Sequence, residues 1–216
     1  MKITIQKFQE LYEISKYELE EMDKSILLVK ALTGMNDLEI EEMPIRKYNK
    51  ICKEVNQTFQ MVNDKMLKGI PKNIVRTNGK WYRLNYDIAK PPMSAGRYVE
   101  VASFSEDIIG NLHKIMASMA TPMKFVGYGF KPIKNHNWSN HDQIANDMLF
   151  MDFKHAFHAG VFFWAVFSRS IQSFRNYFVS LNPEKEEQVD QLLRNLQEHS
   201  DGFTQAKWYQ SLKGSL

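Results

Sequence analysis

The residues of this sequence that could do chemistry are few, and the best set is a group of metal-ligand types. Asp152, His155 and His158 follow one another at three-residue spacing, which places them on successive turns of one helix face. Carboxylate and imidazole groups bind transition metals, but a metal site in a helical bundle also needs Glu and Glu-x-x-His sets from facing helices. His113 has Gly110 instead of a carboxylate three residues before it. We therefore favour histidines that hydrogen-bond within the fold, with a metal-binding bundle enzyme as the alternative.

The other reactive side chains lack the partners that catalysis needs. Cys52 is the single cysteine and lies on an apolar stripe without a histidine nearby in sequence, where a thiol usually packs as a small hydrophobe. His136 and His141 flank Trp138, but nothing there supplies a nucleophile, a base and an orienting group together. No glycine-rich phosphate-binding motif occurs. We expect no catalytic residues, no bound cofactor and no metal.

Composition argues against several classes of partner. The 216 residues include 28 basic and 25 acidic side chains without a block of Lys and Arg, so nucleic-acid binding is disfavoured. The most apolar segment, Ala159–Phe167, is far shorter than the roughly 20 residues that cross a bilayer, so we expect no membrane association. A single cysteine favours a reducing compartment. Packing residues are abundant, with 14 Phe, 12 Met, 9 Tyr and 4 Trp, and we expect function to lie in surfaces that contact partners.

Caps and apolar spacing predict a helical module over residues 1–70. Thr4 is a suitable N-cap for a first helix. Gly34 ends a second helix, because glycine readily adopts the left-handed conformation that closes a helix C-terminus. Asn36 and Glu39 form a capping-box pattern that starts a short third helix.

A seven-residue repeat then predicts a long helix. Its apolar positions alternate in steps of three and four, and they are Ile45, Tyr48, Cys52, Val55, Phe59, Val62 and Met66. Such a seam packs lengthwise on another helix, in the same chain or in a second copy. Because a dimeric seam prefers branched aliphatic residues, we favour packing within the chain, with self-association as the alternative.

Residues 73–102 predict a small antiparallel insertion of three strands. Asn78-Gly79 is a strong hairpin signal, because both residues tolerate the positive φ of a type I′ turn. In that register Arg76 lies opposite Trp81, where a guanidinium can stack on the indole. Arg97–Val101 is interpreted as the third strand beside the hairpin.

The rest of the chain predicts further helices. Ser103 and Glu106 form a second capping-box pattern, opening a helix that ends before Pro122. The glycine- and aromatic-rich residues 127–138 are typical of a loop with an adaptable contact surface. A long helix is expected over residues 140–181, with its second half strongly aromatic.

The fold class is therefore α+β, mainly helical, with a small antiparallel element inserted in a helical bundle. We expect a helical module over residues 1–70 and a second part over residues 71–216, or one continuous domain.

Two groups of sequence strings resemble proteins of tailed bacteriophages. The strings MDKSILLVKALTGM (22–35), LEIEEMP (38–44) and YNK (48–50) resemble a module of tail-assembly chaperones. In that module a helix ends in Leu-x-Gly-Met/Leu and is followed by a short acidic helix and a long one. The strings AGRYVE (95–100) and NLHKIMA (111–117), with the Phe162-Phe163 helix, are similar to proteins encoded near the structural genes of large Bacteroides-type phages, including crAss-like ones.

The resemblance implies a non-enzymatic protein that binds other phage proteins. It would act in tail assembly as a chaperone, or in the virion near the head–tail junction, and so be found in the virion or in the host bacterial cytoplasm during assembly. A protein associated with the packaged nucleic acid is a further alternative. The residues that we expect to contact partners are Tyr48, Phe59, Trp81, Tyr128, Phe130, Trp138, Trp208 and Tyr209.

Overall fold

The computed structural model of the chain describes residues 2–59, 70–86, 107–133 and 141–163, with single positions between 97 and 104 and between 179 and 191. Several predictions lie outside the described residues: Val62 and Met66 of the seam, and the contact candidates Trp138, Trp208 and Tyr209. Most of the aromatic second half of the expected long helix lies outside them as well.

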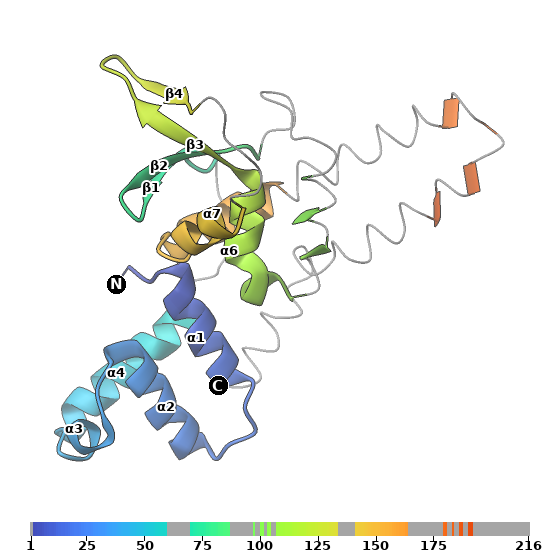
Figure 1. The fold of residues 1–216 in the computed structure, drawn as a ribbon. Helices are drawn as coiled ribbons and strands as arrows, with labels where there is room; N and C mark the ends of the chain where they lie inside the picture. Colours follow the sequence, from blue (N-terminus) through green and yellow to red (C-terminus); the bar gives the residue numbers. More distant parts are fainter. Residues whose placement is uncertain are drawn as a thin grey trace.

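The described elements form a mainly helical fold with one small antiparallel sheet, so the predicted α+β class is confirmed (Figure 1). The first part of the chain contains α1 (Ile5–Ser15), α2 (Glu21–Thr33), α3 (Asp37–Glu41) and α4 (Ile45–Phe59). The second part contains β1 (Ile74–Thr77), β2 (Lys80–Leu84), α6 (Ile108–Met119), β3 (Ala120–Phe125), β4 (Phe130–Pro132) and α7 (His141–Met148). Residues 153–163 are also helical.

The caps of the first helices lie where the sequence predicts them. The Thr4 hydroxyl oxygen accepts a hydrogen bond from the Lys7 N–H at the start of α1, at 3.2 Å. Gly34 ends α2 with a φ of 75°, a left-handed conformation that glycine adopts at little steric cost. Asn36 and Glu39 exchange the two hydrogen bonds of a capping box at the start of α3.

α4 uses the described part of the heptad seam to pack within the chain. Val55 and Phe59 are buried, Tyr48 and Cys52 pack at the edge of the core, and Ile45 is exposed at the first turn. The helix lies against α2.

The sheet has the order β1-β2-β3-β4, and neighbouring strands are antiparallel. The predicted hairpin is confirmed, with Arg76 opposite Trp81. The predicted third strand over Arg97–Val101 is wrong, because the described residues Arg97, Glu100 and Val101 are helical. Val101 is fully buried in the core from that helix, so tertiary packing overrides the local strand preference.

β3 and β4 take the place of the predicted strand. The sequence predicts a helix end before Pro122, and the chain does leave α6 there, but it continues directly into β3. Proline is tolerated in β3 because its missing N–H falls where pairing with β4 ends. The Pro122 carbonyl accepts from the Ile133 N–H, at 3.0 Å, just past the end of β4.

The second predicted capping box is also wrong. The N-cap of α6 is Asp107, whose Oδ1 accepts a hydrogen bond from the Gly110 N–H at 3.0 Å. The Ser103 hydroxyl donates instead to the Glu100 carbonyl, at 2.7 Å. Asp107 takes the role because its carboxylate stands three residues before an unpaired N–H of the first turn.

The long helix predicted from residue 140 is interrupted. α7 ends at Met148, and helical structure resumes only at residue 153. The N-terminal segment enters this gap, because the Ile5 N–H donates to the Met151 carbonyl at 2.9 Å and the Phe153 N–H donates to the Ile3 carbonyl at 2.8 Å. The break is therefore set by a segment from the other end of the chain.

The elements share one hydrophobic core. α6 and α7 lie below β1 and β2, and α1, α2 and α4 form a helical layer beyond them (Figure 1). Buried side chains from Ile3 to Phe163 belong to a single cluster, which spans both parts of the chain. At its centre Phe8 of α1 stacks on Phe153, with ring centroids 3.5 Å apart. None of the helices in the described ranges is long and apolar enough to cross a membrane.

Candidate binding surface

The strand register assigns the side chains of the sheet to two different faces. Successive residues of a strand point to opposite faces, and paired residues point to the same one. Thr77, Tyr82 and Leu84 are buried on the face that lies against the helices. The opposite face, which we name the open face, contains Ile74, Arg76, Trp81, Arg83, Thr121, Met123, Phe125, Phe130 and Pro132.

Aromatic rings form the centre of the open face. The centroid of Phe130 lies 4.6 Å from that of Trp81 and 5.4 Å from that of Phe125. Arg76 lies over the Trp81 ring, with its guanidinium carbon 5.7 Å from the centroid. Phe125 is nevertheless 63% exposed, and Tyr128 in the turn beyond it is fully exposed. Trp81 and Phe130 are half-buried and Met123 is buried, so the exposed apolar surface here is that of Phe125 and Tyr128. Exposed apolar groups next to one another often mark an interaction site.

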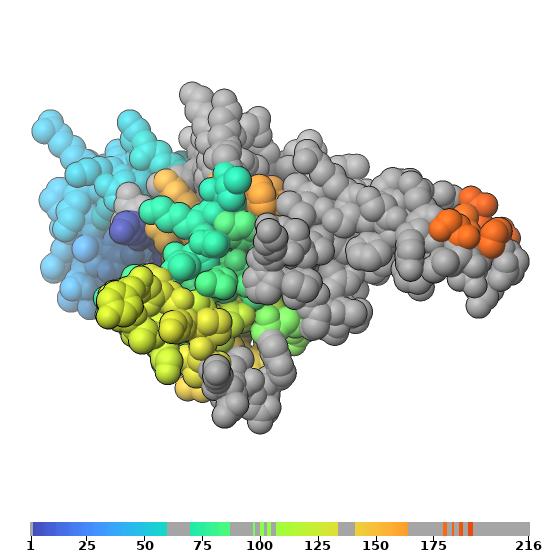
Figure 2. All heavy atoms as spheres, turned by 90° about the horizontal axis from the view of Figure 1, so that it is seen from above, coloured from blue at the N-terminus to red at the C-terminus, as the bar shows by residue number. Residues whose placement is uncertain are grey.

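The open face belongs to two sequence segments that the fold brings together. Figure 2 shows the atoms of residues 70–86 and 120–133 side by side on one surface, and β2 pairs with β3 between them. The hairpin of β3 and β4 projects from the body of the molecule (Figure 1). Its turn contains Gly127 and Gly129, both with positive φ, which allows the tight reversal.

A buried carboxylate holds the first hairpin against α7. The Asp147 carboxylate accepts hydrogen bonds from Asn78 at 2.6 Å, from Lys80 at 2.8 Å and from the Tyr82 hydroxyl. The Thr77 hydroxyl donates to the Asp147 backbone carbonyl at 2.7 Å. Because these four donors all come from β1, β2 and their turn, one residue of α7 fixes the orientation of the sheet.

The electrostatics of this network follow from burial and hydrogen bonding. Burial raises the pKa of Asp147, but the hydrogen bonds from Lys80, Tyr82 and Asn78 more than offset this, so its pKa lies below the ordinary value. Burial, together with the hydrogen bond to Asp147, raises the pKa of Tyr82. The network therefore consists of an ionised carboxylate and a protonated tyrosine at neutral pH, and it serves to position the sheet.

The structure brings together only part of the predicted contact set. Trp81 and Phe130 touch each other on the open face, and Tyr128 lies at the tip of the same hairpin. Phe59 is 3% exposed and belongs to the chain's own core. The Tyr48 hydroxyl hydrogen-bonds to the Ser25 hydroxyl at 2.9 Å, on the edge of the helical layer.

Seven members of the open face were absent from the predicted contact set: Ile74, Arg76, Arg83, Thr121, Met123, Phe125 and Pro132. Met123 and Phe125 belong to the stretch Ala120–Phe125. Its alternation of apolar and polar residues is interrupted by Pro122, and its first residue extends the apolar pattern of the preceding helix, so the stretch did not stand out as a strand. Reading Pro122 as a strand residue would have placed Met123 and Phe125 on one face, since they are two positions apart.

Two of the three residues of the alternative metal site, Asp152 and His155, have structural roles. Asp152 Oδ1 accepts from the His155 N–H at 3.1 Å, as an N-cap does. The His155 ring Nε2 lies 2.9 Å from the Lys72 carbonyl oxygen, and because a carbonyl only accepts, this nitrogen carries the proton. Within the described ranges, no group of three or more His, Cys, Asp and Glu side chains could hold a metal ion.

A serine and a histidine also meet, but without hydrolase geometry. His141 Nε2 lies 3.0 Å from the Ser118 hydroxyl and 3.6 Å from a Glu100 carboxylate oxygen. In a catalytic triad the acid binds the other ring nitrogen and orients the base. Ser118 is also fully buried and donates to the Lys114 carbonyl of its own helix. This arrangement supports the packing of α6 on α7.

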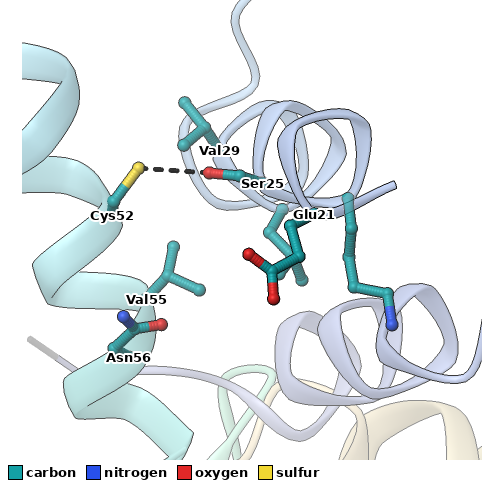
Figure 3. A pocket seen from close by; sticks show the side chains of 8 residues that line it. Glu21, Ser25, Val29, Cys52, Val55 and Asn56 are labelled. Carbon is teal, nitrogen blue, oxygen red and sulfur yellow. Dashed lines mark hydrogen bonds between the residues drawn. The ribbon is translucent and has the colours of Figure 1, made fainter. Parts of the chain in front are cut away.

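A pocket of about 200 Å³ lies between α2 and α4 (Figure 3). Cys52 lines it, and its sulfur lies 3.4 Å from the Ser25 hydroxyl oxygen. The wall is completed by Val29 and Val55, with Glu21 and Asn56 at its polar side. No histidine is among the described residues that line this pocket, and the group beside the thiol is the Ser25 hydroxyl, which is not a base that would form a thiolate.

Comparisons with known proteins found no family model, no curated protein and no solved structure that matches the chain.

Proposed function

We propose that this chain is a non-enzymatic protein of a tailed bacteriophage that binds other phage proteins, as an assembly factor or as part of the mature particle near the head–tail junction. The observation that carries the binding role is the open face, where the half-buried rings of Trp81 and Phe130 and the exposed ring of Phe125 form one cluster beside Arg76. Aromatic residues and arginine are enriched at the centres of protein interfaces. The phage context comes from the resemblance of residues 22–50 to tail-assembly chaperones.

The roles of the reactive side chains are consistent with this proposal. Asp147, Asp152, His155 and Ser118 are engaged in hydrogen bonds that cap helices or join elements. These bonds account for their placement without a substrate. The open face, by contrast, leaves the Phe125 ring 63% exposed.

The test is genetic complementation in the phage that encodes the chain. An interrupted gene should abolish infectious particles, and a plasmid copy of the wild-type gene should restore them. The variant Trp81→Ala/Phe125→Ala should fail to restore them, while Phe150→Ala removes an exposed ring elsewhere and should succeed. A normal particle yield from the interrupted gene would overturn the proposal.

Mass spectrometry of purified particles then separates the two forms of the proposal. A fixed copy number in mature particles assigns the chain to the head–tail region of the virion. Its absence from particles that nonetheless depend on it assigns an assembly role.

A further inference from the structure

The sheet has a charge composition that differs sharply from that of the whole chain. Residues 70–86 and 120–133 contain six basic and no acidic side chains, while the full chain has 28 basic and 25 acidic ones. The basic residues are Lys72, Arg76, Lys80, Arg83, Lys124 and Lys131. Among the ion pairs of the described residues, Lys80 is the member of this set that has an acidic partner, Asp147 of α7. The two segments are far apart in sequence, so the asymmetry emerges only when β2 pairs with β3.

On the open face itself, the charged residues are the arginines Arg76 and Arg83, and they lie beside the aromatic cluster. Arg76 lies opposite Trp81 in the register, and Arg83 is the next residue of β2 on the same face. Arginine at such a position can bind a carboxylate with two parallel hydrogen bonds while its flat side stays against a ring. The open face therefore combines an apolar centre with carboxylate-binding groups at one side.

This chemistry fits an acidic protein segment better than a nucleic acid. Nucleobases bind by stacking on free ring faces. Here the rings pack on one another, since Phe130 is tilted against Trp81 and edge-on to Phe125, and Arg76 covers part of the indole. An aliphatic or aromatic side chain of a protein can instead pack into the angles between such rings. The cluster suits an apolar anchor residue.

We propose that the open face binds an acidic segment of a partner protein, in which an apolar side chain packs on Trp81, Phe125 and Phe130 while neighbouring carboxylates pair with Arg76 and Arg83. This rests on the proposed function, whose partner class it specifies. The described strands β1–β4 contain no Asp or Glu, so no carboxylate of these strands would repel the carboxylates of the bound segment. The binding should weaken with salt, because part of the attraction is between exposed charges.

The experiment measures fluorescence anisotropy of labelled probes with the full chain. The main probe is a synthetic peptide with a central Phe-Leu pair flanked on both sides by Glu and Asp. The comparison probes are a peptide with Lys in place of every acidic residue, an acidic peptide with Gly in place of Phe-Leu, and single-stranded oligo(dT). The chain should bind the main peptide about tenfold or more tightly than each comparison probe.

Variants assign the binding to the open face. Arg76→Glu/Arg83→Glu should weaken binding of the main peptide about tenfold or more. Arg46→Glu/Lys53→Glu makes the same change of charge at exposed positions of α4 and should leave most of the affinity in place. Trp81→Ala should also weaken binding, and Phe125→Ala provides a milder variant because that ring is 63% exposed. Circular dichroism checks that each variant is folded.

Three outcomes overturn the proposal. The first is equal affinity for the acidic and basic peptides, and the second is tighter binding of oligo(dT) that depends on the same arginines. The third is an equal loss in the open-face and α4 charge variants. The peptide-binding results do not alter the result of the complementation experiment. The acidic-segment proposal can therefore be wrong while the proposed phage role is right, and the reverse.

Discussion

The Asp147 carboxylate accepts a hydrogen bond from the Lys80 ammonium, with 2.8 Å between Oδ2 and Nζ, although the Asp147 side chain is only 4% exposed. Lys80 is half-exposed, so its charge is still hydrated in part. The remaining carboxylate interactions come from Asn78 and Tyr82. Hydrogen bonds from several donors stabilise a buried carboxylate, whereas a buried carboxylate without donors would be strongly destabilising. The ion pair thus joins α7 to the sheet that forms the open face.

Replacing Asp147 should therefore destabilise the fold. Asp147→Asn presents an amide to donors that need an acceptor, and we expect a loss of about 2 kcal/mol in the free energy of unfolding. Urea unfolding followed by circular dichroism measures it. Asp142→Asn removes an exposed carboxylate from the same helix and should change little. Equal effects of the two substitutions would contradict the role assigned to the network.

The advantage of Asp147 over asparagine should depend on pH. Because the folded-state pKa of Asp147 lies below the ordinary value of 3.8, the folded chain holds this proton less tightly than the unfolded chain. The stabilisation is therefore complete above 3.8 and is lost as pH falls through the lower folded value. Urea midpoints of wild type and Asp147→Asn should converge in acid. A difference that stays constant would show that the carboxylate's charge is unimportant.

His155 should impose a second pH dependence. Burial lowers its pKa, and the hydrogen bond to Lys72 and the charge of Asp152 do not fully offset this effect. The unfolded chain then binds more protons between the ordinary value of 6.5 and the lower folded value, so stability should fall as pH decreases through that window. His155→Gln can still donate to the Lys72 carbonyl without titrating, and its stability should vary less with pH. An unchanged slope would remove His155 as the cause.

Features that depend on a few neighbouring residues could be predicted from the sequence. The capping box at Asn36 and the C-cap at Gly34 are set within one turn of helix, and the Asn78-Gly79 hairpin fixes its own register. Such local signals do not need information about the rest of the chain.

Features set by distant segments could not be predicted. β3 is a strand because β2 lies beside it, and local signals at Pro122 indicate only that a helix ends. The interruption after α7 depends on backbone hydrogen bonds with the N-terminal segment, such as that from Ile5 to Met151. Pairing partners of this kind are not encoded in local spacing.

The candidate surface shows both effects. Trp81 and Phe130 were predicted as separate contact residues, Trp81 on the Asn78-Gly79 hairpin and Phe130 in the glycine- and aromatic-rich residues 127–138. Their contact and the addition of Phe125 and Arg83 require the complete strand order. The absence of acidic residues from the two sheet segments was likewise not evident from the total charge, because basic and acidic residues are nearly balanced over the whole chain.

The backbone conformation at Gly34 makes a separate prediction. Its φ is +75°, and no atom lies within 4 Å of the position that a Cβ would occupy. Gly34→Ala should therefore cost about 1 kcal/mol through conformation alone. Gly34→Asn should cost less, because asparagine tolerates the left-handed region better. Urea unfolding of both variants tests this order, and equal losses would contradict it.

The packing of Phe8 makes the strongest stability prediction. Its ring is fully buried, stacks on Phe153 at 3.5 Å and meets the edge of Phe59 at 5.8 Å, so it joins α1, α4 and the helical residues 153–163. Phe8→Ala should lower the free energy of unfolding by about 3 to 5 kcal/mol, because it leaves a cavity between three elements. Phe8→Leu keeps much of the volume and should lose less.

Phe150→Ala is the matched control for Phe8→Ala, because Phe150 is 53% exposed in the turn after α7. Its removal should change the free energy of unfolding by no more than about 0.5 kcal/mol. Urea midpoints of the three variants, measured at one pH, should rank Phe150→Ala closest to wild type and Phe8→Ala furthest from it. If Phe8→Ala and Phe150→Ala had the same midpoint, the junction of the three helices would not be the centre of the core. The buried Phe8 ring would then contribute no more to stability than the exposed Phe150 ring.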